Sequence, residues 1–150
     1  MRIWHYKLLP YLPDAQFRGQ LRELVAIMRD WRDYGKTNHI LINRVMDYGK
    51  DELSQYFWQY AVEYYRRYNK SLNDYLEEFN LFSLNVKKAL RPDHSVYLFK
   101  GWHNIEYLRV CMANLYEKYK YGKGKSRLSV EEWGTLLDGY RFITGEEYNV

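Results

Sequence analysis

Apolar side chains recur at helical spacing along most of this chain. Between residues 14 and 33 they follow one another at steps of one, three and four residues, which is the spacing of one buried helix face. Asp14 is suited to cap the start of such a helix, and Gly35 follows its end. The pattern therefore predicts a first helix over residues 14–33.

The same periodicity continues towards the carboxyl end. It predicts a short apolar helix over 38–46 closed by Gly49, a helix over 51–69, one or two shorter helices over 71–90, a helix over 102–121 and a last helix after Ser129. Glu132 lies three residues after Ser129, and this spacing is typical of a capping box.

Strand signals are nearly absent. The one strand candidate, residues 95–99, is short and isolated, and no stretch alternates apolar and polar residues between hairpin turns. The predicted class is all-α, with about five to six helices and an extended N-terminal leader packed back on the first helix. The length of 150 residues and the lack of a linker predict a single domain, 1–150.

Composition narrows the functional classes. No apolar run approaches the roughly 20 residues of a membrane span, and the amino terminus lacks the apolar core of a signal peptide. Cys111 is the only cysteine, so no disulfide framework is expected, and we predict a cytoplasmic protein. The 4 histidines and Cys111 are too widely spaced for a metal signature, and no nucleotide-binding glycine loop occurs, so neither metal nor cofactor is expected.

Positive charge is concentrated late in the chain. The formal net charge is only +4, but residues 117–127 hold five basic side chains and one acidic one, interleaved with tyrosines. Such a segment fits contact with nucleic-acid phosphates and stacking on bases, with Lys118, Lys120 and Lys123 as candidate contacts. The alternative is the soluble end of a helix.

The amino terminus offers a second candidate site. A chain's first α-amine has a pKa of roughly 7.7–8.0, so the amine of Met1 is a usable nucleophile near neutrality. From Asp14 to Glu23 a helix rises roughly 13 Å, whereas the preceding residues reach roughly 40 Å when extended. The leader can therefore fold back and bring Met1 beside Glu23, where the two would form a site for Schiff-base chemistry. The alternative is that Glu23 is an ordinary surface glutamate.

Several cations accompany this site. Arg18, Arg22 and Arg29 project from nearly the same side of the first helix, and with Arg2 they could clamp phosphates. The alternative is a charged face balanced by nearby aspartates. His5 is a candidate to support the site indirectly, or simply to pack against the first helix.

These residues resemble those of a known family, the pyrimidine-dimer DNA glycosylases of phage and bacteria. The resemblance is carried by Met1-Arg2-Ile3 and, at close to the family's distance, Arg22-Glu23-Leu24. It continues more loosely through further segments: Trp4-His5, Gly35-Lys36, residues 38–41, residues 65–69 and residues 107–119.

The resemblance implies a bifunctional enzyme that acts on damaged double-stranded DNA, and we expect it to work as a monomer and without a metal. In the family the α-amine attacks C1′ of the damaged nucleotide, and a glutamate matching Glu23 assists the proton transfers that lead to β-elimination. Arg2 and Arg22 match arginines that hold the DNA backbone. The implied catalytic pair is Met1 and Glu23.

Two positions depart from the family pattern. The phage nucleophile is a threonine exposed when the initiator methionine is removed, whereas here Arg2 follows Met1 directly, so we expect Met1 to be retained. Ala26 stands where the phage pattern has another DNA-contacting arginine. Excision of a different modified base, and a non-catalytic helical DNA-binding module, therefore remain alternatives.

Overall fold

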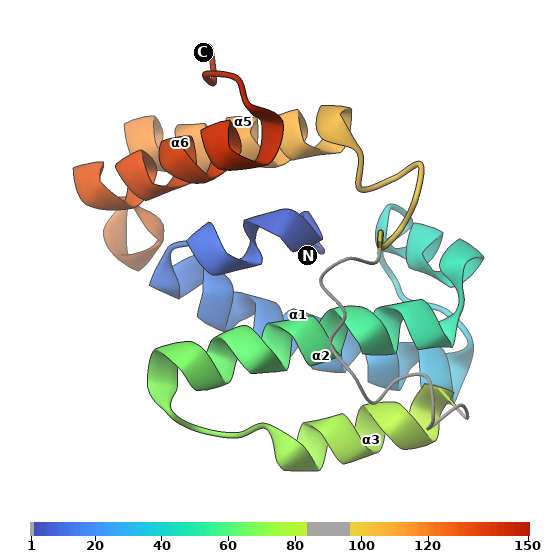
Figure 1. Cartoon of the computed structure of the whole chain (residues 1–150). Helices are drawn as coiled ribbons and strands as arrows, with labels where there is room; N and C mark the ends of the chain where they lie inside the picture. Colours follow the sequence, from blue (N-terminus) through green and yellow to red (C-terminus); the bar gives the residue numbers. More distant parts are fainter. Residues whose placement is uncertain (1, 84–96) are drawn as a thin grey trace. The chain divides into compact units, whose positions relative to one another are not determined.

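A computed structural model describes residues 2–83 and 97–150, and every regular element in these ranges is helical. The elements in Figure 1 are η1 (Tyr6–Tyr11), α1 (Asp14–Tyr34), η2 (Ile42–Tyr48), α2 (Lys50–Tyr68), α3 (Asn73–Ser83), α5 (Ile105–Tyr121), η3 (Gly124–Ser126) and α6 (Val130–Thr144). The all-α prediction is confirmed. Of the strand candidate, residues 97–99 form no strand, and 95–96 lie outside the described residues.

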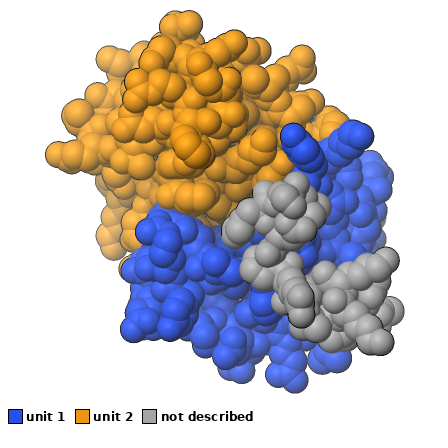
Figure 2. Space-filling view, in the orientation of Figure 1, with its two compact units in different colours: residues 1–3, 21–100 blue, residues 4–20, 101–150 orange. Residues whose placement is uncertain are grey.

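The chain divides into two compact units, coloured separately in Figure 2. Unit 1 comprises Met1–Ile3 and Leu21–Lys100, and unit 2 comprises Trp4–Gln20 and Gly101–Val150. Helix α1 therefore contributes its first residues to unit 2 and the remainder to unit 1. A single domain over 1–150 stays a prediction.

Aromatic rings form much of the unit 1 core. The Phe57 ring on α2 stacks on Phe79 of α3 with ring centroids 4.1 Å apart. Trp31 of α1 meets Phe82 edge-on at 5.3 Å. Both phenylalanines of α3 are almost fully buried. Ring packing thus joins α3 to α2 and to the unit 1 part of α1.

In unit 2, α5 and α6 lie side by side (Figure 1). Trp133 of α6 stacks on Tyr119 of α5 with ring centroids 5.6 Å apart. The predicted capping box is present, because Ser129 Oγ accepts from Glu132 N–H at 3.1 Å and a Glu132 carboxylate oxygen accepts from Ser129 N–H at 2.9 Å. Helix α6 therefore begins where the sequence predicts.

Several boundaries differ from prediction. The leader is not extended throughout, because Tyr6–Tyr11 forms a 3₁₀ helix whose first turn is capped by His5 Nδ1. The short helix expected over 38–46 is instead a loop followed by the 3₁₀ helix η2. Helix α5 begins three residues later than expected, at Ile105, because Asn104 caps it. Of the predicted helical region 71–90, α3 accounts for Asn73–Ser83, and residues 84–90 lie outside the described part.

Candidate active site and nucleic-acid interface

Glu23 lies on α1 in unit 1 and is half-buried. One of its carboxylate oxygens, Oε2, accepts a hydrogen bond from the backbone N–H of Arg2 at 3.3 Å. That nitrogen belongs to the first peptide bond of the chain. Glu23 is thus held against the backbone at the very start of the leader, while Met1 itself lies outside the described residues.

A second backbone contact fixes the leader within unit 2. The N–H of Trp4 donates to Gln20 Oε1 on α1 at 2.8 Å, and Gln20 is fully buried. The nearby Gln16 is also buried, and its Nε2 donates to the Ser126 carbonyl at 3.0 Å. Sequence reasoning missed this role of Gln20. Two glutamines one turn apart among the apolar residues of a helix were the signal, because a buried amide needs hydrogen-bond partners.

The predicted arginines differ in their surroundings. Arg22 is exposed beside Glu23, and Arg2 is half-exposed. In unit 2, Arg18 pairs with Asp14 at 3.0 Å, and both side chains are exposed. Exposed pairs of this kind are weak and exchange readily for other partners. Arg2 and Arg22 thus lie in the same unit as Glu23.

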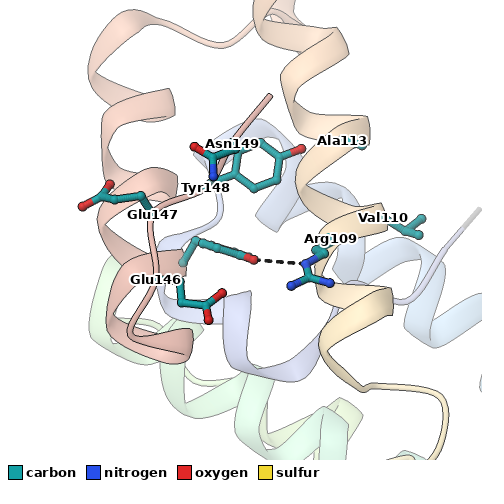
Figure 3. A pocket seen from close by; sticks show the side chains of 8 residues that line it. Arg109, Val110, Ala113, Glu146, Glu147, Tyr148 and Asn149 are labelled. Atoms are coloured by element: carbon teal, nitrogen blue, oxygen red, sulfur yellow. Dashed lines mark hydrogen bonds between the residues drawn. The ribbon is translucent and has the colours of Figure 1, made fainter.

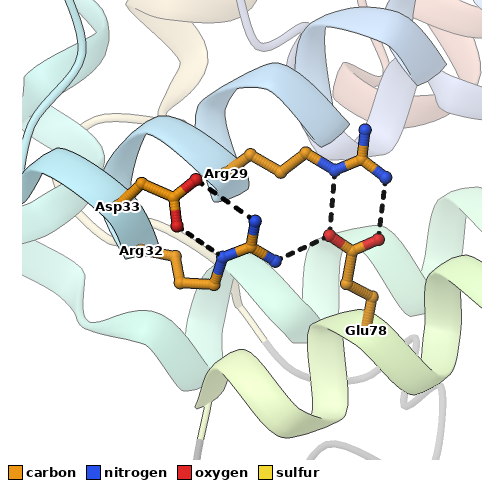
Figure 4. A network of polar contacts seen from close by, with 4 residues as sticks. All are labelled: Arg29, Arg32, Asp33 and Glu78. Carbon is orange, nitrogen blue, oxygen red and sulfur yellow. Dashed lines mark hydrogen bonds and ion pairs between the residues drawn. The ribbon is translucent and has the colours of Figure 1, made fainter.

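Arg29 has a different role in this structure. Its Nε and one terminal guanidinium nitrogen each donate to Glu78 of α3 at 2.9 Å, and Arg32 donates to the same carboxylate (Figure 4). Arg32 also pairs with Asp33. The hydrogen bonds from Arg29 lower the pKa of the Glu78 carboxyl below its ordinary value. Arg29 therefore links α1 to α3, and contact with a phosphate would require this pair to open.

The predicted lysines lie on and just after α5 in unit 2. Lys120 and Lys123 are exposed, and Lys118 is half-buried. Lys120 and Arg127 line an open hollow of about 420 Å³ together with Tyr119 and residues 128–130, which lead into α6. Two cations beside a tyrosine ring suit a phosphate and its neighbouring base. Arg127 belongs to the basic segment but was not among the predicted contacts.

His5 is buried in a cluster of rings within unit 2. Its imidazole centroid is 5.1 Å from that of His103, and His103 in turn lies 4.9 Å from the Tyr107 ring. Burial lowers the pKa of His5 to about 4, so the imidazole is neutral near neutrality. The N–H of Tyr6 donates to His103 Nδ1 at 3.1 Å. His5 and His103 together hold the start of η1.

Comparison with protein-family models shows which family the chain belongs to. The model of the pyrimidine dimer DNA glycosylases matches residues 1–76 of this chain. The chain belongs to the pyrimidine dimer DNA glycosylase family. Searches of curated proteins and of solved structures found no match.

The family match covers the part of the chain that holds the candidate catalytic residue. Arg2, Arg22 and Glu23 all lie inside the matched residues, whereas the lysine segment lies outside them. Members of the pyrimidine dimer DNA glycosylase family are DNA-repair enzymes that act on DNA, so this protein is an enzyme of that kind.

A pocket of this glycosylase lies between α5 and the residues after α6 (Figure 3). Its volume is about 410 Å³, and Arg109 Nε points across it and donates to the Tyr140 hydroxyl at 3.4 Å. Glu146 and Glu147 also line it, so its charge is mixed.

Among the described residues, no group of three or more His, Cys, Asp or Glu side chains is placed to hold a metal ion, and no helix is long and apolar enough to cross a membrane.

Proposed function

We propose that this protein is a DNA glycosylase with abasic-site lyase activity, in which the α-amine of Met1 is the nucleophile and Glu23 is the acid–base residue. The hydrogen bond from Arg2 N–H to Glu23 carries the proposal, because Arg2 directly follows the proposed nucleophile. Arg2 and Arg22, whose guanidinium groups would contact the phosphates, lie in the same unit as Glu23.

The proposed chemistry needs only water besides the DNA. The amine's lone pair forms a bond to C1′, and the base leaves with the electrons of the C1′–N bond and takes up a proton that the amine releases. The C1′–O4′ bond then opens and the remaining amine proton passes to O4′, which gives an imine. Removal of a C2′ proton forms a C2′=C3′ double bond and expels the 3′ phosphate, and water finally releases the amine.

Glu23 suits two steps of this sequence. Its negative charge stabilises the positive charge that develops on the sugar as the base leaves. As a carboxylate it also accepts a proton, from the amine or from C2′, and general acid–base catalysis of this kind contributes roughly 10²–10⁴-fold to rate. Arg2 and Arg22 supply paired donors to the phosphates on either side of the reacting nucleotide.

The first test is borohydride trapping on an abasic duplex. Untagged protein, with Met1 verified as its first residue by mass spectrometry, is expected to form a covalent adduct with the DNA. Chemical blocking of the α-amine, or a peptide added before Met1, is expected to abolish the adduct. An adduct of equal yield after blocking would exclude Met1 as the nucleophile.

The second test replaces Glu23 by Gln. An amide oxygen can still accept the hydrogen bond from Arg2, so DNA binding should stay within about threefold while strand cleavage slows roughly 10²–10⁴-fold. Asp30→Asn is the matched control, since Asp30 is a half-buried carboxylate two turns later on the same helix.

Duplexes carrying a pyrimidine dimer, an abasic site and a hydroxymethylated pyrimidine are compared side by side, and we expect the dimer to be preferred among the base lesions.

A further inference from the structure

The loop between α1 and η2 presents two large apolar side chains to solvent. Ile40 is 86% exposed and Leu41 is 85% exposed. The next apolar residues, Ile42 and Val45, are almost fully buried, so the loop already has its own core anchors. Folding of unit 1 therefore gives no reason for the apolar character of this pair.

The loop that carries this pair is held firmly at its base. Buried Thr37 donates its N–H to Asn43 Oδ1 at 2.8 Å, and Asn43 Nδ2 donates back to the Thr37 carbonyl at 3.1 Å. The His39 carbonyl accepts from Ile42 N–H at 3.0 Å. These bonds close residues 37–43 into a compact turn, so binding through its tip requires little further ordering of the backbone.

The charges around the tip of the loop indicate which class of partner binds there. Residues 34–46 contain Lys36 and Arg44, both exposed, and of the acidic residues that flank this range, Asp33 pairs with Arg32 and Asp47 is exposed, so cations prevail around the tip. An apolar tip between cations fits the grooves of a nucleic acid, where the cations contact phosphates and the tip contacts bases. A second copy of the chain would bring the same positive charge to the same surface.

We propose that Ile40 and Leu41 form an apolar wedge that inserts at a base step of the DNA duplex and kinks it. Proteins that kink DNA commonly insert isoleucine or leucine between bases. Along α1, Glu23 is roughly 16 Å from Tyr34, where the loop begins, or about five base-pair rises. Because the loop follows the end of α1, beyond Glu23, we expect the wedge to act at a step away from the reacting nucleotide and to lower the cost of extruding that nucleotide.

The inference rests on the proposed function, so its test separates binding from chemistry. The probe is a duplex with a tetrahydrofuran abasic analogue, which cannot form an imine, and 2-aminopurine placed at successive steps on either side. Wild-type protein is expected to raise 2-aminopurine fluorescence at one step within about five base pairs of the analogue. Ile40→Ser combined with Leu41→Ser should remove that increase.

Leu81→Ser is the control, because Leu81 is 66% exposed on α3 of the same unit. Borohydride trapping provides the second readout. The double variant should be about tenfold slower than wild type on an abasic duplex but equal to it on abasic single-stranded DNA, where no stacking must be broken. Failure of wild-type trapping on both substrates would refute the proposed chemistry and leave the fluorescence test standing.

Two results would overturn the wedge. One is an unchanged fluorescence increase in the double variant, and the other is an equal loss of trapping on duplex and single strand. Sedimentation of the free protein tests the alternative that a second copy of the chain binds the loop. A dimer that the double variant abolishes would assign the loop to self-association, whereas the same sedimentation for both proteins supports the wedge.

Discussion

At the scale of single residues, burial separates two groups that both lie near the start of the chain. Glu23 is half-buried and keeps access to solvent, whereas His5 is 3% exposed. A group that exchanges protons with a substrate needs access, and a group that positions the backbone does not. We therefore expect His5 to act through the leader that it holds in place and not through proton transfer.

The lowered pKa of His5 predicts an acid-sensitive fold. The native imidazole stays neutral down to about pH 4, whereas the unfolded one takes up a proton below about 6.5. The unfolded state thus binds more protons in this window, and stability falls as pH is lowered from 6.5 to 4, by on the order of 3 kcal/mol. Urea unfolding across this range should show a flatter profile for His5→Gln. Parallel profiles for the two proteins would contradict the assignment.

The sequence singled out Glu23 by its reach to the amino terminus and by the resemblance of Arg22-Glu23-Leu24 to the family pattern, and the catalytic role of Glu23 stays a prediction. The sequence was not sufficient to select Gln20. The contact between Gln20 and Trp4 depends on how the leader is aligned along α1. Tertiary packing sets this alignment, and the spacing of residues in the sequence does not reveal it. The sequence predicted Arg29 as a phosphate contact and could not show its pairing with Glu78, because Glu78 lies 49 residues away along the chain.

At the scale of elements, local signals located most helices well. Capping residues and glycines act over a few residues, and so α6 begins after its capping box and η2 ends at Gly49, which adopts a φ of 88°. The loop before η2 was predicted as helix because its apolar residues fit that spacing. Only the structure separates Ile42, which faces the core, from Ile40, which does not.

The contact between η1 and α6 gives a prediction at this scale. A Cβ added to Gly139 would lie 2.5 Å from Tyr11 Cγ, so Gly139→Ala forces the ring or the helix to move. We expect a loss of about 1–3 kcal/mol in unfolding free energy. Gly134→Ala on the same helix is the control, since a Cβ there meets nothing within 4 Å. Alanine should stabilise that position by about 0.5–1 kcal/mol. Equal effects in calorimetry would refute the close contact.

At the scale of the whole molecule, we expect positive charge to steer the encounter with DNA. The net charge of +4 is small, so binding must depend on where the cations gather. The segment with Lys118, Lys120 and Lys123 stands out in the sequence by its density of cations, and its contact with DNA stays a prediction. Its hollow with Arg127 could not be foreseen, because residues 128–130, which lead into α6, complete it.

The dependence of DNA affinity on salt tests this segment. Each phosphate contact releases counterions and adds about 0.9 to the slope of log affinity against log salt. Replacing Lys118, Lys120 and Lys123 together by Gln should lower the slope by between about 1 and 3. Lys70→Gln should leave the slope unchanged, because Lys70 is an exposed lysine between α2 and α3 of unit 1, outside the basic segment. Fluorescence anisotropy on an abasic duplex between low and moderate salt measures it. Identical slopes for the triple variant and wild type would remove these lysines from the interface.

The path of the chain through its two units has a practical consequence. Residues 4–20 complete the same unit as residues 101–150, although some 80 residues intervene. A fragment ending at residue 76, where the family match stops, would leave that early segment without the helices that cover it. Cutting between residues 100 and 101 would instead leave unit 1 whole in one piece and divide unit 2 between the two, so unit 2 should form only when the pieces are mixed.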